Sequence, residues 1–390
     1  MQAATLLDVS RLTARVGNGR LPTGVDRVVL SYIREWGPRA QAVLQKGSWR
    51  RIVPMRESQR LFELLLDPPR DVRTQMNLAI AKACLPPWPS QDAQGRFSFN
   101  LSHTGIDKPG LSEWLARTRQ RGLFFVHDLI PITHPEYCRA GEHALHARRM
   151  ETLLTAGAGL ICNSQTTLDE LTRFAQARSL PMPAAVVAPL APAALQPAPD
   201  STPPMDAPYF VVLGTIEPRK NHLLLLHVWR RLAESLGARA PHLVIVGQRG
   251  WECENVVDML ERCESLQGLV HELPHCGDAE LARYLSHARA LLFPSFAEGF
   301  GLPLLESLAL GTPVVASSLP VFREIAGDIP DYLDNLDGPA WQRAVEEYAR
   351  ADSGRRAAQL ERMAGLPIPT WDAHFRKVRE LLERLDVSTR

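Results

Sequence analysis

The chain has 390 residues, of which 45% are hydrophobic and 22% charged, as in a folded protein with room for two domains. No uninterrupted apolar run approaches the ~18 residues of a membrane span, and the N-terminus lacks the basic-then-apolar pattern of a signal peptide, so we expect a cytoplasmic protein. The six cysteines include no Cys-x-x-Cys pair, which argues against a zinc site or a disulfide framework.

The net charge of +1 conceals an asymmetry between the two halves of the chain. Residues 1–195 carry 24 Lys and Arg against 16 Asp and Glu, a balance of +8, which leaves 20 against 27, or −7, for residues 196–390. A basic first half would suit an anionic acceptor or peripheral contact with the inner face of a membrane. The alternative is that two oppositely charged halves attract each other. We expect no nucleic-acid partner.

The first half alternates strand-like and helix-like segments, which is the pattern of an α/β domain. Residues 11–22 contain Gly17, Gly19 and Pro22 and are predicted to form a loop. The predicted strands are 5–9, 42–44, 51–53, 97–101, 123–126, 160–162 and 185–188. The predicted helices are 24–36, 61–66, 72–84, 111–121, 142–155 and 164–177, the last capped by Ser164 or Thr166.

Seven prolines between Pro189 and Pro208 mark a linker, which we place at 196–208 between domains at 1–195 and 209–370. The second domain has the same alternation as the first, and two α/β domains joined in this way predict a ligand cleft between them. Its predicted strands are 209–213, 243–246, 269–273, 291–293 and 314–316. Its predicted helices are 221–236, 254–266, 278–288, 303–310, 321–325 and 338–350, and a last helix follows at 371–385.

Residues 291–317, LLFPSFAEGFGLPLLESLALGTPVVAS, predict a strand, a loop, a helix that begins at Pro303, and a second strand. The start of such a helix faces the carboxyl ends of the strands, where free N–H groups favour phosphate. Glu298 stands in the loop and Glu306 in the first turn of the helix. The alternatives are that Glu298 is an exposed loop residue and that Glu306 only complements the helix dipole.

Residues 214–221, GTIEPRKN, follow the first strand of the second domain. Arg219 and Lys220 beside a helix start could clamp a phosphate group, or the segment could be a solvated loop that Asn221 caps. Carboxylates accept hydrogen bonds from sugar hydroxyls, so two cations with Glu298 and Glu306 suit a nucleotide sugar better than a bare phosphate.

The run 298–306, EGFGLPLLE, with 309–316, ALGTPVVA, resembles the Glu-x7-Glu motif of retaining family 4 glycosyltransferases. The segment EPRKN resembles the diphosphate-binding segment of that family. The likeness covers most of residues 205–330 and is weaker in the first half. It implies the α/β GT-B fold, in which two Rossmann-like domains face each other across a cleft, with residues 371–390 packed back on the first domain.

The resemblance also implies roles for individual residues. Glu298 would contact the donor sugar, Glu306 the ribose hydroxyls, and Lys220 with Arg219 the leaving diphosphate. Many members have arginine directly after the strand glycine, where this chain has Thr215, so Arg219 would have to supply that charge. The donor would also meet three backbone amides, those of Phe300, Gly301 and Leu302.

In the first half, residues 21–27, LPTGVDR, resemble the glycine loop of the family, with Gly24 opening a helix near the diphosphate. His127 ends a strand where the family often has a histidine on the donor sugar, although it could be purely structural. Asn100 and His103 follow another strand and are candidates for the acceptor side. The alternative for Gly24 is an ordinary helix start.

The chain has no Asp-x-Asp run, so we expect no metal and no other cofactor. Positive charge from Lys220, Arg219 and helix starts would stabilise the departing diphosphate. The resemblance implies attack by the acceptor on the face of the leaving group, helped by a phosphate oxygen, so that the anomeric configuration is retained.

Residues 127–131, HDLIP, and 133–136, THPE, are similar to bacterial mannosyltransferases. They make GDP-mannose the first candidate donor and a glycan or lipid-linked oligosaccharide of O-antigen, capsule or exopolysaccharide the acceptor. The alternatives are a UDP- or dTDP-sugar donor such as rhamnose or glucose, a related phosphorylase or epimerase, or a sugar-nucleotide-binding module that transfers nothing.

Overall fold

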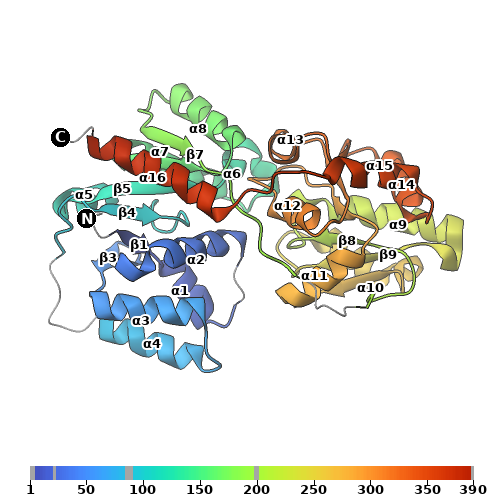
Figure 1. The fold of residues 1–390 in the computed structure, drawn as a ribbon, viewed down its shortest axis with the longest axis horizontal. Helices are drawn as coiled ribbons and strands as arrows, with labels where there is room; N and C mark the ends of the chain where they lie inside the picture. Colours follow the sequence, from blue (N-terminus) through green and yellow to red (C-terminus); the bar gives the residue numbers. More distant parts are fainter. Residues whose placement is uncertain (1–4, 21–22, 84–90, 197–201, 388–390) are drawn as a thin grey trace. The chain divides into compact units, whose positions relative to one another are not determined.

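The computed structural model describes residues 5–20, 23–83, 91–196 and 202–387 (Figure 1). Contacts within the chain define two compact units. The first comprises residues 1–132, 143–190 and 371–390, and the second comprises 133–142 and 191–370. This division differs from the predicted domains mainly at residues 133–142, which pack with the second unit.

A seven-stranded sheet in the order β3-β2-β1-β4-β5-β6-β7 forms the centre of the first unit. Neighbouring strands are parallel, apart from the antiparallel pair of β2 and β3. The strands are β1 (Leu6–Asp8), β2 (Gln41–Lys46), β3 (Trp49–Ile52), β4 (Phe97–Asn100), β5 (Arg121–Val126), β6 (Gly159–Cys162) and β7 (Ala184–Val187). The helices are α1 (Ser10–Gly17), α2 (Gly24–Trp36), α3 (Met55–Leu66), α4 (Val72–Ala83), α5 (Leu111–Arg117), α6 (Ile130–Thr133), α7 (Glu142–Ala156), α8 (Gln165–Ala177) and α16 (Trp371–Val387).

The second unit has a six-stranded, fully parallel sheet in the order β10-β9-β8-β11-β12-β13. Its strands are β8 (Tyr209–Leu213), β9 (His242–Val246), β10 (Val270–Leu273), β11 (Leu291–Phe293), β12 (Val314–Ser317) and β13 (Asp331–Leu333). Its helices are α9 (His222–Leu236), α10 (Glu254–Arg262), α11 (Asp278–His287), α12 (Leu302–Ala309), α13 (Pro320–Ala326), α14 (Gly338–Ala349) and α15 (Gly354–Met363). Both units are therefore α/β with Rossmann-like parallel sheets, as predicted.

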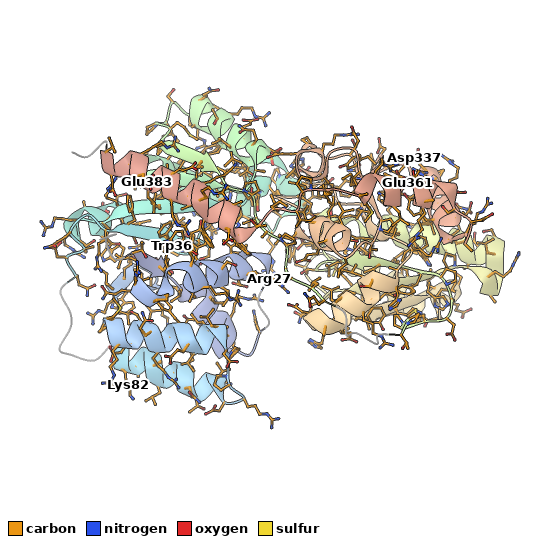
Figure 2. The ribbon with its side chains drawn as sticks, in the orientation of Figure 1. Arg27, Trp36, Lys82, Asp337, Glu361 and Glu383 are labelled. Atoms are coloured by element: carbon orange, nitrogen blue, oxygen red, sulfur yellow. The ribbon has the colours of Figure 1, made fainter. Side chains whose placement is uncertain are left out.

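Helix α16 belongs to the first unit and lies along β7 (Figure 1). Its His374 is hydrogen-bonded to the Tyr32 hydroxyl at 3.0 Å and to the Ala188 carbonyl at 3.0 Å. Trp36 lies at the end of α2 (Figure 2). Its ring stacks on that of Phe99 of β4 with centroids 5.1 Å apart. Among the described residues, no helix combines the length and apolarity that a bilayer crossing requires.

Several predictions of secondary structure were wrong: α6 was not predicted, α3 begins before the predicted residue 61, and three further elements differ. Residues 10–17 form α1 rather than a loop, because Leu12, Thr13 and Val16 lie on one buried face that the nearby glycines obscured. Strand β13 was missed because it is only three residues long and half-buried. Helix α15 was missed because it has no apolar stripe, and its one buried residue is Gln359.

The buried amide of Gln359 joins α15 to the sheet. It donates to the carbonyls of Val314 and Ile329 at 2.7 and 2.9 Å, and its oxygen accepts from the Val314 N–H and the Tyr348 hydroxyl. Since a buried polar group that loses its partner costs about 1–3 kcal/mol, this amide holds α15 in place.

We expect Gln359→Leu to lower the free energy of unfolding by about 3 kcal/mol, because it removes the buried hydrogen bonds of the amide to the N–H and the carbonyl of Val314 and to the Tyr348 hydroxyl. Urea denaturation measures this change. The matched control Gln267→Leu alters an exposed amide and should change stability by less than about 0.5 kcal/mol. Equal stability of Gln359→Leu and the wild type would contradict the bridging role.

Candidate functional site

Two loops of the second unit lie side by side because the strands before them, β8 and β11, are parallel neighbours. The first loop runs from Gly214 to Asn221 and the second from Pro294 to Gly301. The Phe296 N–H donates to the Arg219 carbonyl at 2.9 Å, and the Asn221 side chain donates to the Pro294 carbonyl at 3.2 Å. Asn221 therefore ties the loops together instead of capping α9 with its side chain.

Glu298 lies at the centre of these loops. Its Oε1 accepts hydrogen bonds from Lys220 Nζ at 2.6 Å and from the Ser295 hydroxyl at 2.7 Å, and its Oε2 lies 2.7 Å from Arg219 Nη1. Only 8% of the Glu298 side chain is exposed, so it is not an exposed loop residue. Arg219 also donates to the Ala297 carbonyl and to Glu217.

The pKa values of Glu298 and Lys220 are affected differently by burial and by the neighbouring charges. Burial raises the pKa of Glu298, but Arg219 and Lys220 outweigh it and hold the pKa at about 2. Burial lowers the pKa of Lys220, and Glu298 only partly offsets this. The difference follows from the contacts, because Glu298 has two cations and a hydroxyl while Lys220 shares its one carboxylate with Arg219. We infer that Glu298 is firmly ionised.

Lys220 is held by packing as well as by charge. Its ammonium lies 4.9 Å from the centroid of the Phe293 ring, and its stem crosses Gly214. Gly214 has φ of 143°, and a Cβ there would come within 3.1 Å of Lys220 Cε. Glycine at this position therefore leaves room for the lysine to reach Glu298.

Helix α12 begins at Leu302, one residue before the predicted start, and places the other donor-site candidates. Gly301 precedes it with φ of 113°, and a Cβ there would lie 2.9 Å from the Phe322 ring. Glu306 is the fifth residue of α12, not a first-turn residue as predicted. It is buried, and its Oε1 lies 3.4 Å from the Ala193 N–H, while Phe300 is buried just before the helix.

In the first unit, Gly24 is the first residue of α2, and Thr23 and Asp26 close a capping box around the start of this helix. Asp26 is fully buried and pairs with Arg11 and Arg15 of α1 at 3.1 and 2.9 Å. The resemblance drew attention to Gly24, but Asp26 and its two arginines were not foreseen. Leu21 and Pro22 of the same motif lie outside the described residues.

His127 follows β5 and is buried. Its Nε2 lies 2.7 Å from the Leu101 carbonyl, which can only accept, so Nε2 carries a proton. Burial lowers the pKa of His127, although the bond to Leu101 opposes this, and the ring is therefore neutral. Its Nδ1 is then left with a lone pair that can accept a hydrogen bond.

Asn100 and His103 come to the same edge of the sheet as His127, because β4 and β5 are parallel neighbours. The Asn100 amide donates to the Thr104 carbonyl at 2.8 Å and so shapes its own loop. His103 is buried with φ of 57°, and its ring lies 5.4 Å from that of His127 and 5.3 Å from that of His146. His146 comes from α7, and no motif pointed to it.

Burial and the neighbouring His146 and His127 lower the pKa of His103 well below its ordinary value. The rings of His103 and His127 are therefore both neutral. Ser164 is confirmed as a helix cap, since its hydroxyl accepts from the Thr167 N–H at 3.1 Å. The acceptor role of Asn100 and His103 stays a prediction.

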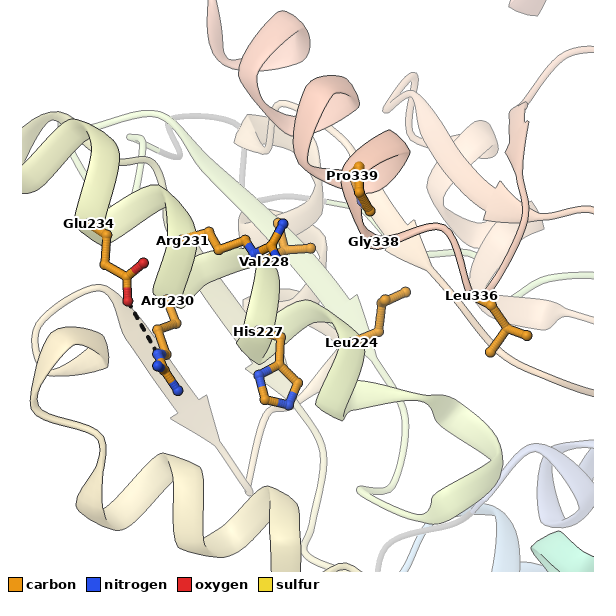
Figure 3. Close-up of a pocket in the computed structure, with 9 residues that line it drawn as sticks. All are labelled: Leu224, His227, Val228, Arg230, Arg231, Glu234, Leu336, Gly338 and Pro339. Atoms are coloured by element: carbon orange, nitrogen blue, oxygen red, sulfur yellow. Dashed lines mark hydrogen bonds and ion pairs between the residues drawn. The ribbon is translucent and has the colours of Figure 1, made fainter.

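A cavity of about 570 Å³ lies elsewhere in the second unit, between α9 and the start of α14 (Figure 3). The Arg230–Glu234 ion pair on its wall measures 3.3 Å. It is lined by Leu224, His227, Val228, Arg230, Arg231, Glu234, Leu336, Gly338 and Pro339. None of these is a predicted site residue.

Residues 198–329 match the sequence model of the family "Glycosyl transferases group 1". This part of the chain is similar to a group 1 glycosyl transferase domain, and the match covers about a third of the chain. It contains Arg219, Lys220, Glu298 and Glu306, so the Glu298 cluster described above lies inside the matched segment. The resemblance predicted from the Glu-x7-Glu motif is thereby confirmed at the level of this family.

Curated relatives match parts of the chain. The Escherichia coli O-antigen chain mannosyltransferase B is 34% identical over 164 residues, which is 42% of each chain. The Escherichia coli serotype-specific mannosyltransferase WbdA is 35% identical over 142 residues, 36% of this chain and 17% of that protein. The chain thus spans less than half the length of these relatives.

The fold has whole-chain counterparts among solved structures. The Anabaena protein HepE in complex with UDP and glucose superposes with a TM-score of 0.67 at 14% identity, covering 100% of this chain and 99% of HepE. Sucrose-phosphate synthase from Thermosynechococcus elongatus superposes with a TM-score of 0.63 at 17% identity, covering 100% of both chains. The GT-B fold predicted from the sequence is confirmed.

We expect Glu298→Gln to lower the free energy of unfolding at pH 7 by about 3 kcal/mol, because it leaves the buried Lys220 without the carboxylate it pairs with and Arg219 with Glu217 alone. The folded-state pKa of Glu298 is depressed from 4.5 to about 2, so its contribution is complete above pH 4.5 and is lost as pH falls towards 2. The stability difference between wild type and variant should therefore shrink across that interval. Denaturation curves between pH 7 and 2 measure it, and a difference independent of pH would contradict the ionised state of Glu298.

Proposed function

We propose that the protein is a glycosyltransferase that moves a hexose from a nucleotide-diphosphate sugar to a glycan acceptor in the synthesis of a bacterial surface polysaccharide. The ionised Glu298, held between Lys220 and Arg219 at the carboxyl ends of β8 and β11, carries this proposal. The group 1 domain and the names of the mannosyltransferase relatives support it.

The cluster supplies the two chemical features that a nucleotide sugar requires. The Lys220 ammonium has three N–H donors, of which Glu298 takes one, so further donors can serve a diphosphate oxygen. The ionised Glu298 can accept hydrogen bonds from sugar hydroxyls but cannot supply a proton. Its proposed role is therefore to orient the donor sugar and to balance positive charge that develops on it in the transition state.

Glu306 is proposed to hold the ribose hydroxyls, and the backbone N–H groups of Phe300, Gly301 and Leu302 to face the donor. The N–H groups in the first turn of a helix have no partner within the helix. Pro303 is the second residue of α12, so its missing N–H removes no hydrogen bond of the helix. In the first unit, Gly24 has the equivalent place at the start of α2. His127, as a neutral acceptor at Nδ1, would receive a hydrogen bond from a hydroxyl of the donor sugar.

We further propose that the reaction retains the anomeric configuration and needs no metal ion. Lys220, Arg219 and the helix start would stabilise the leaving diphosphate by charge and hydrogen bonds. The acceptor hydroxyl would attack from the same face and give its proton to the leaving phosphate. GDP-mannose is the proposed donor, with UDP- and dTDP-sugars as the competing choices.

The acceptor is proposed to be a glycan or a lipid-linked oligosaccharide. The excess positive charge of residues 1–195 would favour an anionic acceptor or the membrane surface that displays a lipid-linked one. Such contact is electrostatic and should weaken as salt is added.

A donor screen tests this function most broadly. We expect GDP-mannose to raise the melting temperature more than UDP-, dTDP- or ADP-sugars at equal concentration, because only the bound native state gains free energy. The shift should be the same in EDTA and in Mg²⁺ or Mn²⁺. Stabilisation by another nucleotide sugar would correct the donor, dependence on a divalent ion would refute the metal-free mechanism, and no stabilisation by any donor would refute the donor site.

A further inference from the structure

Residues 133–142 belong to a different unit from the residues that precede and follow them in the chain. The chain enters this segment from residues of the first unit and returns to the first unit after it, yet the contacts of the segment itself place it in the second unit. It consists of the end of α6, the 3-10 turn Pro135–Tyr137 and the start of α7. We call residues 133–142 the arm.

Tyr137 of the arm stacks on Phe296. The ring centroids are 4.8 Å apart and the planes differ by 6°, while His134 lies almost parallel on Tyr137 with centroids 6.2 Å apart. Phe296 belongs to the loop that carries Glu298, and its N–H donates to the Arg219 carbonyl at 2.9 Å. Tyr137 thus contacts a residue, Phe296, whose backbone is hydrogen-bonded to Arg219, the ion-pair partner of Glu298.

Arg139 of the arm makes a second contact. Its guanidinium lies 4.9 Å from the centroid of the Trp251 ring, in the loop that follows β9. That loop is tied to the loop after β8, since the Gly250 N–H donates to the Ile216 carbonyl at 2.9 Å and the Ile216 N–H to the Gln248 carbonyl at 2.9 Å. The arm therefore contacts the loops after β9 and β11 directly and the loop after β8 through them.

These three loops follow neighbouring strands, because β9, β8 and β11 are adjacent in the sheet. A loop has fewer backbone hydrogen bonds than a strand, so ring contacts such as these add to the hydrogen bonds and ion pairs that limit how far it moves. Reaction geometry is sensitive to such movement, since misplacement by about 1 Å can cost about 100-fold in rate.

We propose that the arm is a positioning element of the donor site, in which Tyr137 holds the Glu298 loop through Phe296 and Arg139 holds the β9 loop through Trp251. The inference rests on the proposed function for its effect on the donor, but the holding of the loops does not depend on it. Neither Tyr137 nor Arg139 is assigned a contact with substrate.

Tyr137→Ala and Tyr137→Phe separate positioning from general packing. The stack needs the ring and not the hydroxyl, so Tyr137→Phe should stay within about 2-fold of wild type in donor KM and kcat. Tyr137→Ala should lose about 10-fold in kcat/KM for the donor, the effect of one aromatic pair. Tyr284→Ala removes another half-buried tyrosine of the second unit and should change the melting temperature without changing the donor constants.

A double-mutant cycle and hydrogen exchange complete the test. The variant with both Tyr137→Ala and Phe296→Ala should be no worse than either single variant, because both remove one contact. In Tyr137→Ala, amide exchange should quicken at residues 294–301 and remain unchanged in α14. This last measurement needs no substrate.

The outcomes are distinguishable. Three results would each contradict the positioning role of the arm. They are additive effects of the two substitutions, equal loss of activity in Tyr137→Phe and Tyr137→Ala, and unchanged amide exchange at residues 294–301. If the wild type binds no nucleotide sugar while exchange quickens as expected, the proposed function fails and the arm stands as the holder of these loops.

Discussion

The ion pairs of Glu298 with Lys220 and Arg219 are the interaction on which the candidate site depends. A buried carboxylate is tolerated only if opposite charges and hydrogen bonds replace its hydration, and here two cations and the Ser295 hydroxyl do so. The same contacts bring two loops together that are 78 residues apart in the chain. The conformation of these two loops and the charge of the candidate site therefore depend on the same contacts.

The parallel sheet of the second unit makes this cluster geometrically feasible. Because β8 and β11 are hydrogen-bonded neighbours, the loops after both strands end at the same edge. Gly214 clears a path for the Lys220 stem, and Gly301 lets the chain turn into α12 against Phe322. The first unit has a corresponding edge, where His127 is fixed as a neutral acceptor by the Leu101 carbonyl. The arm adds a third level of support, since Tyr137 holds Phe296 from outside the loop.

Much of the fold could be predicted from the sequence, and the sequence also named Glu298, Lys220 and Arg219, which the structure brings together. Short apolar runs alternating with amphipathic segments predicted both sheets, and the spacing of Glu298 and Glu306 predicted a ligand site at a helix start. The Lys220–Glu298 pair could not be predicted, because it depends on β8 lying beside β11. The local sequence pattern predicts where strands occur but not their order in the sheet. His146 and Asp26 were missed for the same reason, since each acts through partners from another element. Helix α15 was missed because its one buried side chain is polar.

The central claim is that Glu298 acts on the donor sugar, and a comparison of two glutamate variants tests it most directly. Glu361 is an exposed glutamate of α15 in the same unit, so Glu361→Gln is a matched control for Glu298→Gln (Figure 2). Transfer from GDP-mannose should fall by about 100-fold or more in kcat for Glu298→Gln, the scale of one lost transition-state contact in a buried site, and should be unchanged for Glu361→Gln. Equal turnover by both variants, with both folded, would contradict the account.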